Sequence, residues 1–221
     1  MRWVFPVVVA AVVSAAAAGF GDAEVQILDK PVKFDKERER LTLEYRRIHQ
    51  DPKADSITIE PRMIVLHYTG GGSFKGTWRY FNRTRLEGGR EKLKKAGAVN
   101  VLAHFVVDRD GRIFRLVSET TMGRHAIGLN HVAIGVENVG DGDRYPLTDE
   151  QVEANAALVR YLAGKHAITH LIGHHESRQM EDHEYWLELD PKYRNRKPDP
   201  GKAFMKKVRT KVADLRLDGP P

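Results

Sequence analysis

The sequence predicts an α/β fold, a single domain in which helices flank a central mixed β-sheet. Its 221 residues are enough for one domain with a sizeable core. Short apolar runs of strand type alternate with amphipathic segments of helix type, which is typical of one sheet with helices packed on it. Apart from the apolar first residues, the chain has neither an internal repeat nor a low-complexity segment.

Residues 1–18, "MRWVFPVVVAAVVSAAAA", have the layout of a secretory signal peptide: one early arginine, an apolar run and then small residues. The alternative is an uncleaved membrane anchor, but the apolar run is shorter than the ~20 residues that a spanning helix needs. We therefore expect an exported protein, periplasmic or secreted, with no stable membrane insertion after cleavage. Because the chain has no cysteine, its stability outside the cell depends on its core rather than on disulfides.

Residues 19–61 are expected to form a lead-in that is irregular up to residue 33. A charged helix is predicted over 34–50, where apolar residues recur on one face. The main domain is expected over 62–215 and begins with a short apolar strand, "MIVLH". Residues 74–97 are rich in Lys, Arg and Glu and are expected to be partly helical.

The second half of the chain carries clearer local signals. Two apolar runs joined at Asp110-Gly111 predict a β-hairpin. Thr148, followed three residues later by Gln151, predicts a capping-box start to a helix that runs to about His166. Further strands are predicted in "HVAIGVENVG" and "ITHLIGHH", and a closing helix over 201–215.

The formal net charge of +6 is compatible with a nucleic acid, an anionic lipid or an acidic wall polymer as partner. No basic run with interleaved aromatic residues is present, so we expect no nucleic-acid partner. The net charge is equally compatible with a well-solvated surface and does not by itself select a partner.

Three side chains form a chemically sensible set for a catalytic zinc. His67 and His174 end two predicted strands, where an α/β sheet usually presents its chemistry. Asp199 lies between two prolines that stiffen its backbone, with Lys197 beside it. Two imidazoles and one carboxylate leave a fourth zinc position open for water. The spacing forms no compact motif, so the residues alone leave open that the ten histidines are scattered through core and surface.

Five motifs occur in the order seen in one enzyme family: "MIVLHYTGG", "AHFVVDRDGRIFRLV", "RHAIGLNHVAIGVENVG", "LIGHHE" and "RKPDPGKAF". Over residues 62–215 the chain resembles the zinc-dependent N-acetylmuramoyl-L-alanine amidases, which include phage lysozyme-type amidases and peptidoglycan recognition proteins. The resemblance implies hydrolysis of the amide between N-acetylmuramic acid and L-alanine, in peptidoglycan or muropeptides.

Carried over by motif, the resemblance implies that His67, His174 and Asp199 bind Zn²⁺. It also implies that Lys197 stabilises the oxyanion and that Glu137 lies near the attacking water. Without the family, Lys197 could be a solvated surface lysine and Glu137 a strand-end carboxylate that faces water.

The chain departs from part of the family at the proton-handling position. Phage-type and recognition-type members have a tyrosine before the histidine of the "HF" strand, whereas Ala103 precedes His104 here. The resemblance to the bacterial branch therefore assigns proton transfer to Glu137. His174 is followed by His175; because side chains alternate along a strand, only one of the two can face the metal, and the preceding Gly173 favours His174.

The sequence leaves two interpretations open for the segment between His174 and Lys197. The segment 177–195 is longer than in short members, and its aromatic residues could form a substrate rim or a packed flap. We expect a supporting hydrogen-bond role for His104, whereas His125 is a candidate for substrate contact.

The alternatives to an amidase are a non-catalytic peptidoglycan-binding module of the same fold, a zinc hydrolase of another N-acylated peptide, and a cytosolic recycler of muropeptides, which the signal peptide disfavours.

Overall fold

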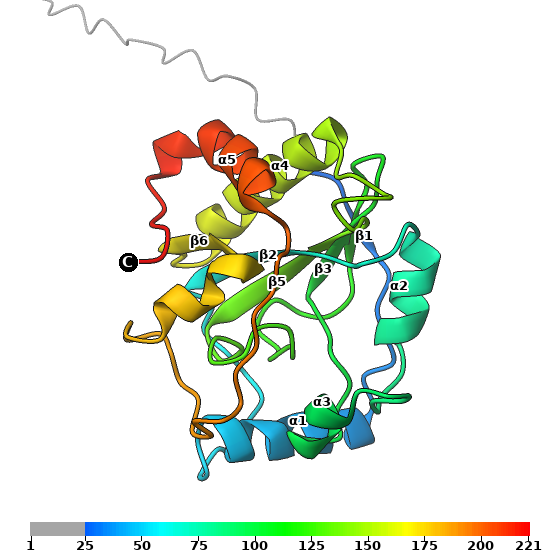
Figure 1. The fold of residues 1–221 in the computed structure, drawn as a ribbon, viewed down its shortest axis with the longest axis vertical. Helices are drawn as coiled ribbons and strands as arrows, with labels where there is room; N and C mark the ends of the chain where they lie inside the picture. Colours follow the sequence, from blue (N-terminus) through cyan, green and yellow to red (C-terminus); the bar gives the residue numbers. More distant parts are fainter. Residues whose placement is uncertain (1–24) are drawn as a thin grey trace, which may run out of the picture.

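The computed structural model describes residues 25–221, so the expected signal peptide, residues 1–18, lies outside the described part (Figure 1). Six strands form one sheet in the order β1-β4-β3-β5-β2-β6. β3 and β4 pair antiparallel and the other neighbours pair parallel, so the sheet is mixed, as predicted. The strands are β1 (Ile27–Asp29), β2 (Met63–Tyr68), β3 (Phe105–Val107), β4 (Ile113–Arg115), β5 (Ala133–Asn138) and β6 (His170–Gly173).

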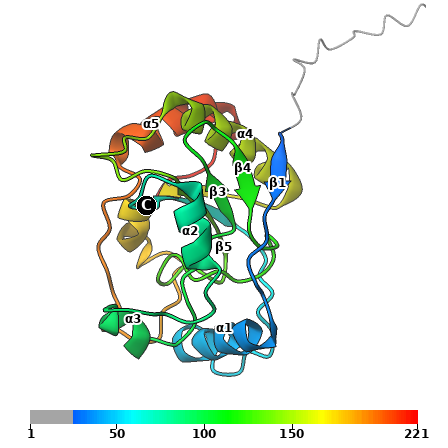
Figure 2. The ribbon, with the colours of Figure 1, turned by 90° about the vertical axis from the view of Figure 1, so that its right-hand side faces the viewer.

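Helices surround this sheet: α1 (Lys36–His49), α2 (Phe74–Phe81), α3 (Glu91–Lys95), α4 (Asp149–Lys165) and α5 (Lys202–Lys211), with 3-10 turns η1 (His174–Met180) and η2 (Ala213–Leu215). α4 begins with the predicted capping box, in which Thr148 and Gln151 bond each other's backbone N–H groups. α4 and α5 lie side by side against one face of the sheet, while α1 and α3 lie at the opposite end of the molecule (Figures 1 and 2). Within residues 25–221, no helix is long and apolar enough to cross a membrane.

Alternation along the two central strands divides the core between two faces. Ile64 and Leu66 of β2, like Ile134 and Val136 of β5, belong to the apolar cluster formed with α4 and α5. Their odd-numbered neighbours must point to the opposite face, because successive strand side chains alternate. His67 and Glu137 therefore lie on the face away from α4 and α5.

Two local predictions were wrong. β1 lies within the stretch expected to be irregular and pairs with β4 at the edge of the sheet, where Figure 2 shows the two strands together. Three residues are too few for a detectable alternation, and the partner strand supplies the hydrogen bonds. The strand predicted through His175 instead ends at Gly173, and the next residues turn into η1, where the Glu176 carboxylate accepts a hydrogen bond from the Gly173 N–H at 2.8 Å.

Candidate active site

Parallel pairing brings three site residues to the carboxyl ends of adjacent strands. In the register between β2 and β5, His67 lies beside Glu137. In the register between β2 and β6, Leu66 lies beside Gly173, so His174 emerges directly next to His67. Neighbouring strands are ~4.8 Å apart, so residues at matched positions share one face at close range.

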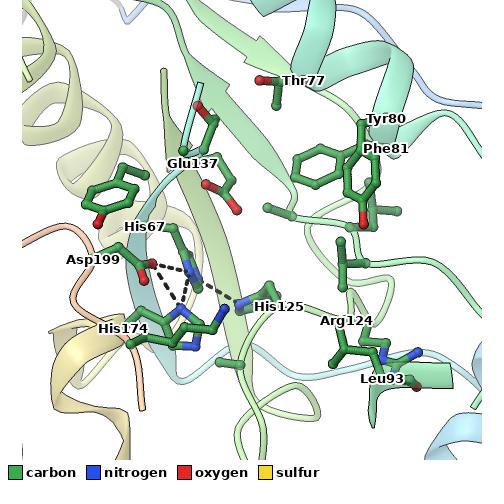
Figure 3. Close-up of a pocket in the computed structure, with 18 of the residues that line it drawn as sticks. His67, Thr77, Tyr80, Phe81, Leu93, Arg124, His125, Glu137, His174 and Asp199 are labelled. Atoms are coloured by element: carbon green, nitrogen blue, oxygen red, sulfur yellow. Dashed lines mark hydrogen bonds and ion pairs between the residues drawn. The ribbon is translucent and has the colours of Figure 1, made fainter. Parts of the chain in front are cut away.

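Asp199 reaches the same point from the loop before α5. Its backbone carbonyl accepts a hydrogen bond from the His175 N–H at 2.8 Å, which pins the loop to η1. Its Oδ2 lies 3.0 Å from His174 Nδ1 and 3.3 Å from His67 Nδ1, and these two nitrogens are 2.9 Å apart. All three side chains are buried (Figure 3). The structure thus brings together the three residues that the sequence singled out, and it leaves His175 outside the group.

Hydrogen bonds determine the tautomer of His67. The carbonyl of Ala133 can only accept, so His125 Nε2, at 3.1 Å, carries a hydrogen. His125 Nδ1 is then an acceptor and takes the Nε2–H of His67 at 3.1 Å. His67 Nδ1 therefore presents a lone pair to His174 and Asp199. A partner that holds the distant ring nitrogen in this way is a usual support for a metal-ligating histidine.

The protonation states of His174 and Asp199 also favour binding of a cation. Burial, together with His67, lowers the pKa of His174 to about 4, so its ring is neutral near pH 7. Burial opposes ionisation of Asp199, but the hydrogen bond from the His174 ring outweighs it and holds the pKa of the carboxyl well below its usual range. Ligands at ~2.0–2.1 Å around a tetrahedral zinc lie roughly 3.3 Å from one another. The donor types and their spacing therefore fit a zinc ion.

Glu137 has the environment of a proton-handling carboxyl. Burial, and secondarily the negative charge of Asp199, raise the pKa of Glu137 well above its ordinary value, although Lys197 and Arg90 oppose the shift. Its Oε2 is buried and has no hydrogen-bond partner among the described residues. A carboxyl in this state holds a proton up to a higher pH than an ordinary glutamate does, which suits a group that accepts and returns a proton.

A cavity of about 520 Å³ connects these groups. Glu137, the exposed Lys197 and the three clustered side chains line one part of it. Thr77, Tyr80, Phe81 and Leu93, from α2 and α3, line the opposite wall (Figure 3). The arrangement can therefore hold an extended ligand against a metal, a proton carrier and an ammonium group.

His104 takes the supporting role that was expected, and His125 makes a contact that was not expected. His125 contacts His67 directly, so its first role in the structure is to hold a neighbouring ring, although it also lines the cavity. His104 is buried behind it; its Nδ1 accepts the Gly135 N–H at 3.0 Å and its Nε2 donates to the Thr121 carbonyl at 2.8 Å. Burial lowers the pKa of His104 to about 4, in keeping with the expected supporting role.

Within the segment 177–195, one aromatic residue packs as a flap would and another lies at the cavity as a rim residue would. Trp186 packs against the buried cluster that contains Met180, as a flap would. Tyr193 lines the cavity and its hydroxyl accepts a hydrogen bond from Arg124 at 3.1 Å, as a rim residue would.

Most residues that line the cavity were not singled out in the sequence, and one of them lies outside the expected main domain. Tyr45 of α1, within the expected lead-in, also lines the cavity. Tyr45 lies on the apolar face of the helix predicted over 34–50, but no local signal connects it with the site.

Comparison with known proteins identifies the family of this chain and several similar proteins. The family described as N-acetylmuramoyl-L-alanine amidase matches residues 58–202. The endolysin of Escherichia phage T7 is 34% identical over 92 residues, which cover 39% of this chain and 61% of the endolysin. The chain thus matches less than two thirds of that relative's length.

Solved structures share the fold at lower identity. The N-acetylmuramoyl-L-alanine amidase LysCS of Clostridium intestinale has a TM-score of 0.54 at 22% identity, covering 90% of this chain and all of LysCS. A selenomethionine derivative of AmpD has a TM-score of 0.52 at 23% identity, covering 86% of this chain and 94% of AmpD.

Proposed function

Because the chain belongs to the N-acetylmuramoyl-L-alanine amidase family, we propose that it is a zinc-dependent hydrolase of the amide between N-acetylmuramic acid and L-alanine, in peptidoglycan or muropeptides. The observation that carries this proposal is the buried cluster of His67 Nδ1, His174 Nδ1 and Asp199 Oδ2 at the wall of a large cavity. These residues would hold the zinc. A zinc ion bound there would supply Lewis-acid chemistry that activates water and polarises a carbonyl.

Glu137 and Lys197 would have two different catalytic roles, proton transfer and stabilisation of negative charge. Glu137 would accept a proton from the attacking water and pass it to the leaving amine nitrogen, a role that its raised pKa supports. The ammonium group of Lys197 would stabilise the negative charge that develops on the amide oxygen. The register that places Glu137 beside His67 supports this division, because the proton acceptor and the metal ligands then face the same part of the cavity.

The presence of all three candidate ligands together with a proton carrier favours an enzyme over a binding module of the same fold. We also propose that the protein is exported, on the basis of the signal-type residues 1–18. Peptidoglycan outside the cytoplasm would then be its substrate.

Metal analysis beside an amidase assay tests the proposal. The wild-type protein should contain about one zinc per chain, and a chelator should abolish its release of free stem peptide from purified sacculi. Asp199→Ala should lose both zinc and activity. Asp182→Ala removes an exposed carboxylate elsewhere and should retain both. A metal-free protein that still releases stem peptide would refute the site, and binding to sacculi without any release would identify a recognition module.

A further inference from the structure

The net positive charge of the chain is concentrated in one segment. Residues 75–95 contain eight Lys and Arg residues against two Glu residues, which leaves 28 basic and 28 acidic residues in the rest of the chain. The excess in this segment therefore equals the formal net charge of +6. We call its exposed basic side chains the basic wall: Lys75, Arg79, Arg83, Arg85, Arg90, Lys92, Lys94 and Lys95.

Most of the basic wall has no charge partner. Three of its members form exposed ion pairs, which are Arg83–Glu87, Arg85–Glu37 and Lys94–Glu91. The other five lie beyond ion-pair distance of every carboxylate in residues 25–221, and they are Lys75, Arg79, Arg90, Lys92 and Lys95. Exposed ion pairs of this kind are weak, so the electrostatic potential at the basic wall remains strongly positive.

Five of the eight residues of the basic wall lie in α2 and α3, the two helices that also line the cavity, and the other three lie in the segment between these helices. Thr77, Tyr80 and Leu93 of α2 and α3 line the wall opposite the histidine–aspartate cluster (Figure 3). Arg79, Lys92 and Lys95 of the same helices are exposed and do not line the cavity. The charge therefore lies beside the cavity and outside it, where it can contact parts of a large substrate that the cavity does not enclose.

We propose that the basic wall docks the protein on intact peptidoglycan through the carboxylates of its stem peptides. The proposal rests on the proposed function, because that function supplies a polymer that repeats the same anionic peptide many times. Several weak contacts act together on such a polymer, whereas a soluble fragment presents few carboxylates at once. The protein would accordingly act better on intact wall than on soluble fragments, and its attachment would weaken with salt because the Debye length is only ~8 Å at physiological ionic strength.

The test compares two triple variants that lose equal charge. Arg79→Gln/Lys92→Gln/Lys95→Gln neutralises the basic wall without touching the cavity. Lys36→Gln/Lys53→Gln/Lys206→Gln removes three exposed charges from other parts of the surface. Each protein is sedimented briefly with purified sacculi at low and high salt, and its hydrolysis of a soluble muramyl peptide is measured separately.

We expect the wall variant to bind sacculi about 10-fold more weakly or worse at low salt, while its hydrolysis of the soluble peptide stays unchanged. The control variant should bind as the wild type does, and amidation of the sacculus carboxylates should release the wild type. Unchanged binding by the wall variant, or an equal loss in the control variant, would overturn the proposal. Tighter binding to anionic phospholipid vesicles than to sacculi would also overturn it, in favour of a membrane. Absence of hydrolysis in every protein would refute the proposed function alone, because sedimentation measures docking without cleavage.

Discussion

Replacing His125 tests the proposed metal site without altering a proposed ligand. The ring accepts the Nε2–H of His67 at 3.1 Å and is itself held by the Ala133 carbonyl at 3.1 Å. His125→Leu removes that acceptor, so the lone pair of His67 is no longer held toward the cluster. Loss of such a supporting group typically lowers metal affinity ~10–100-fold, or about 1.4–2.7 kcal/mol. We expect a loss of zinc affinity in this range.

Two further variants make the test specific. His125→Asn retains an acceptor oxygen and should keep most of the zinc affinity. Gly135→Ala should act in the same direction as His125→Leu, because a Cβ at Gly135 would lie only 2.6 Å from His125 Cγ and would displace the ring. Zinc affinity is measured by competition with a chelator of known affinity, and thermal unfolding of the zinc-free proteins separates a binding defect from a folding defect. Wild-type affinity in a folded His125→Leu protein would refute the tautomer argument.

Four other outcomes are expected. Lys197→Ala should lower kcat ~10²–10³-fold in the amidase assay while zinc content stays the same, because one oxyanion donor is lost. Glu137→Gln should lower kcat ~10²–10⁴-fold, again with zinc retained, since the amide cannot accept the proton. Gly128→Ala should lower the unfolding free energy by roughly 1–3 kcal/mol in denaturant titrations, because φ is +78° and a Cβ would lie 2.6 Å from the Trp186 ring. For the zinc-free protein, the unfolding free energy should fall as pH drops from ~6.5 toward 4, because in this range only the unfolded state binds a proton at His104. His104 alone would contribute a slope of up to about 1.4 kcal/mol per pH unit. The slope should be smaller in His104→Gln, and an unchanged slope in that variant would contradict the prediction.

Local sequence signals predicted the start of one helix, a hairpin and the candidate site residues. The Thr148 capping box defines the start of α4, and the Asp110-Gly111 turn defines the hairpin of β3 and β4, with Gly111 at φ 83° as such a turn requires. The motifs around His67 and Asp199 identified these two side chains as candidate metal ligands. Each of these signals lies within a few residues of the feature it predicts, so no partner segment is needed to recognise it.

Only the tertiary structure decided how the site is assembled. His67 and His174 are 107 residues apart, and they meet because β6 pairs with β2 in one particular register. The contact of His125 with His67 and the contribution of Tyr45 to the cavity depend in the same way on packing between distant segments. Strand order and register are set by the summed burial of whole faces and by hydrogen bonds between strands, and neither quantity can be evaluated from one short stretch of chain.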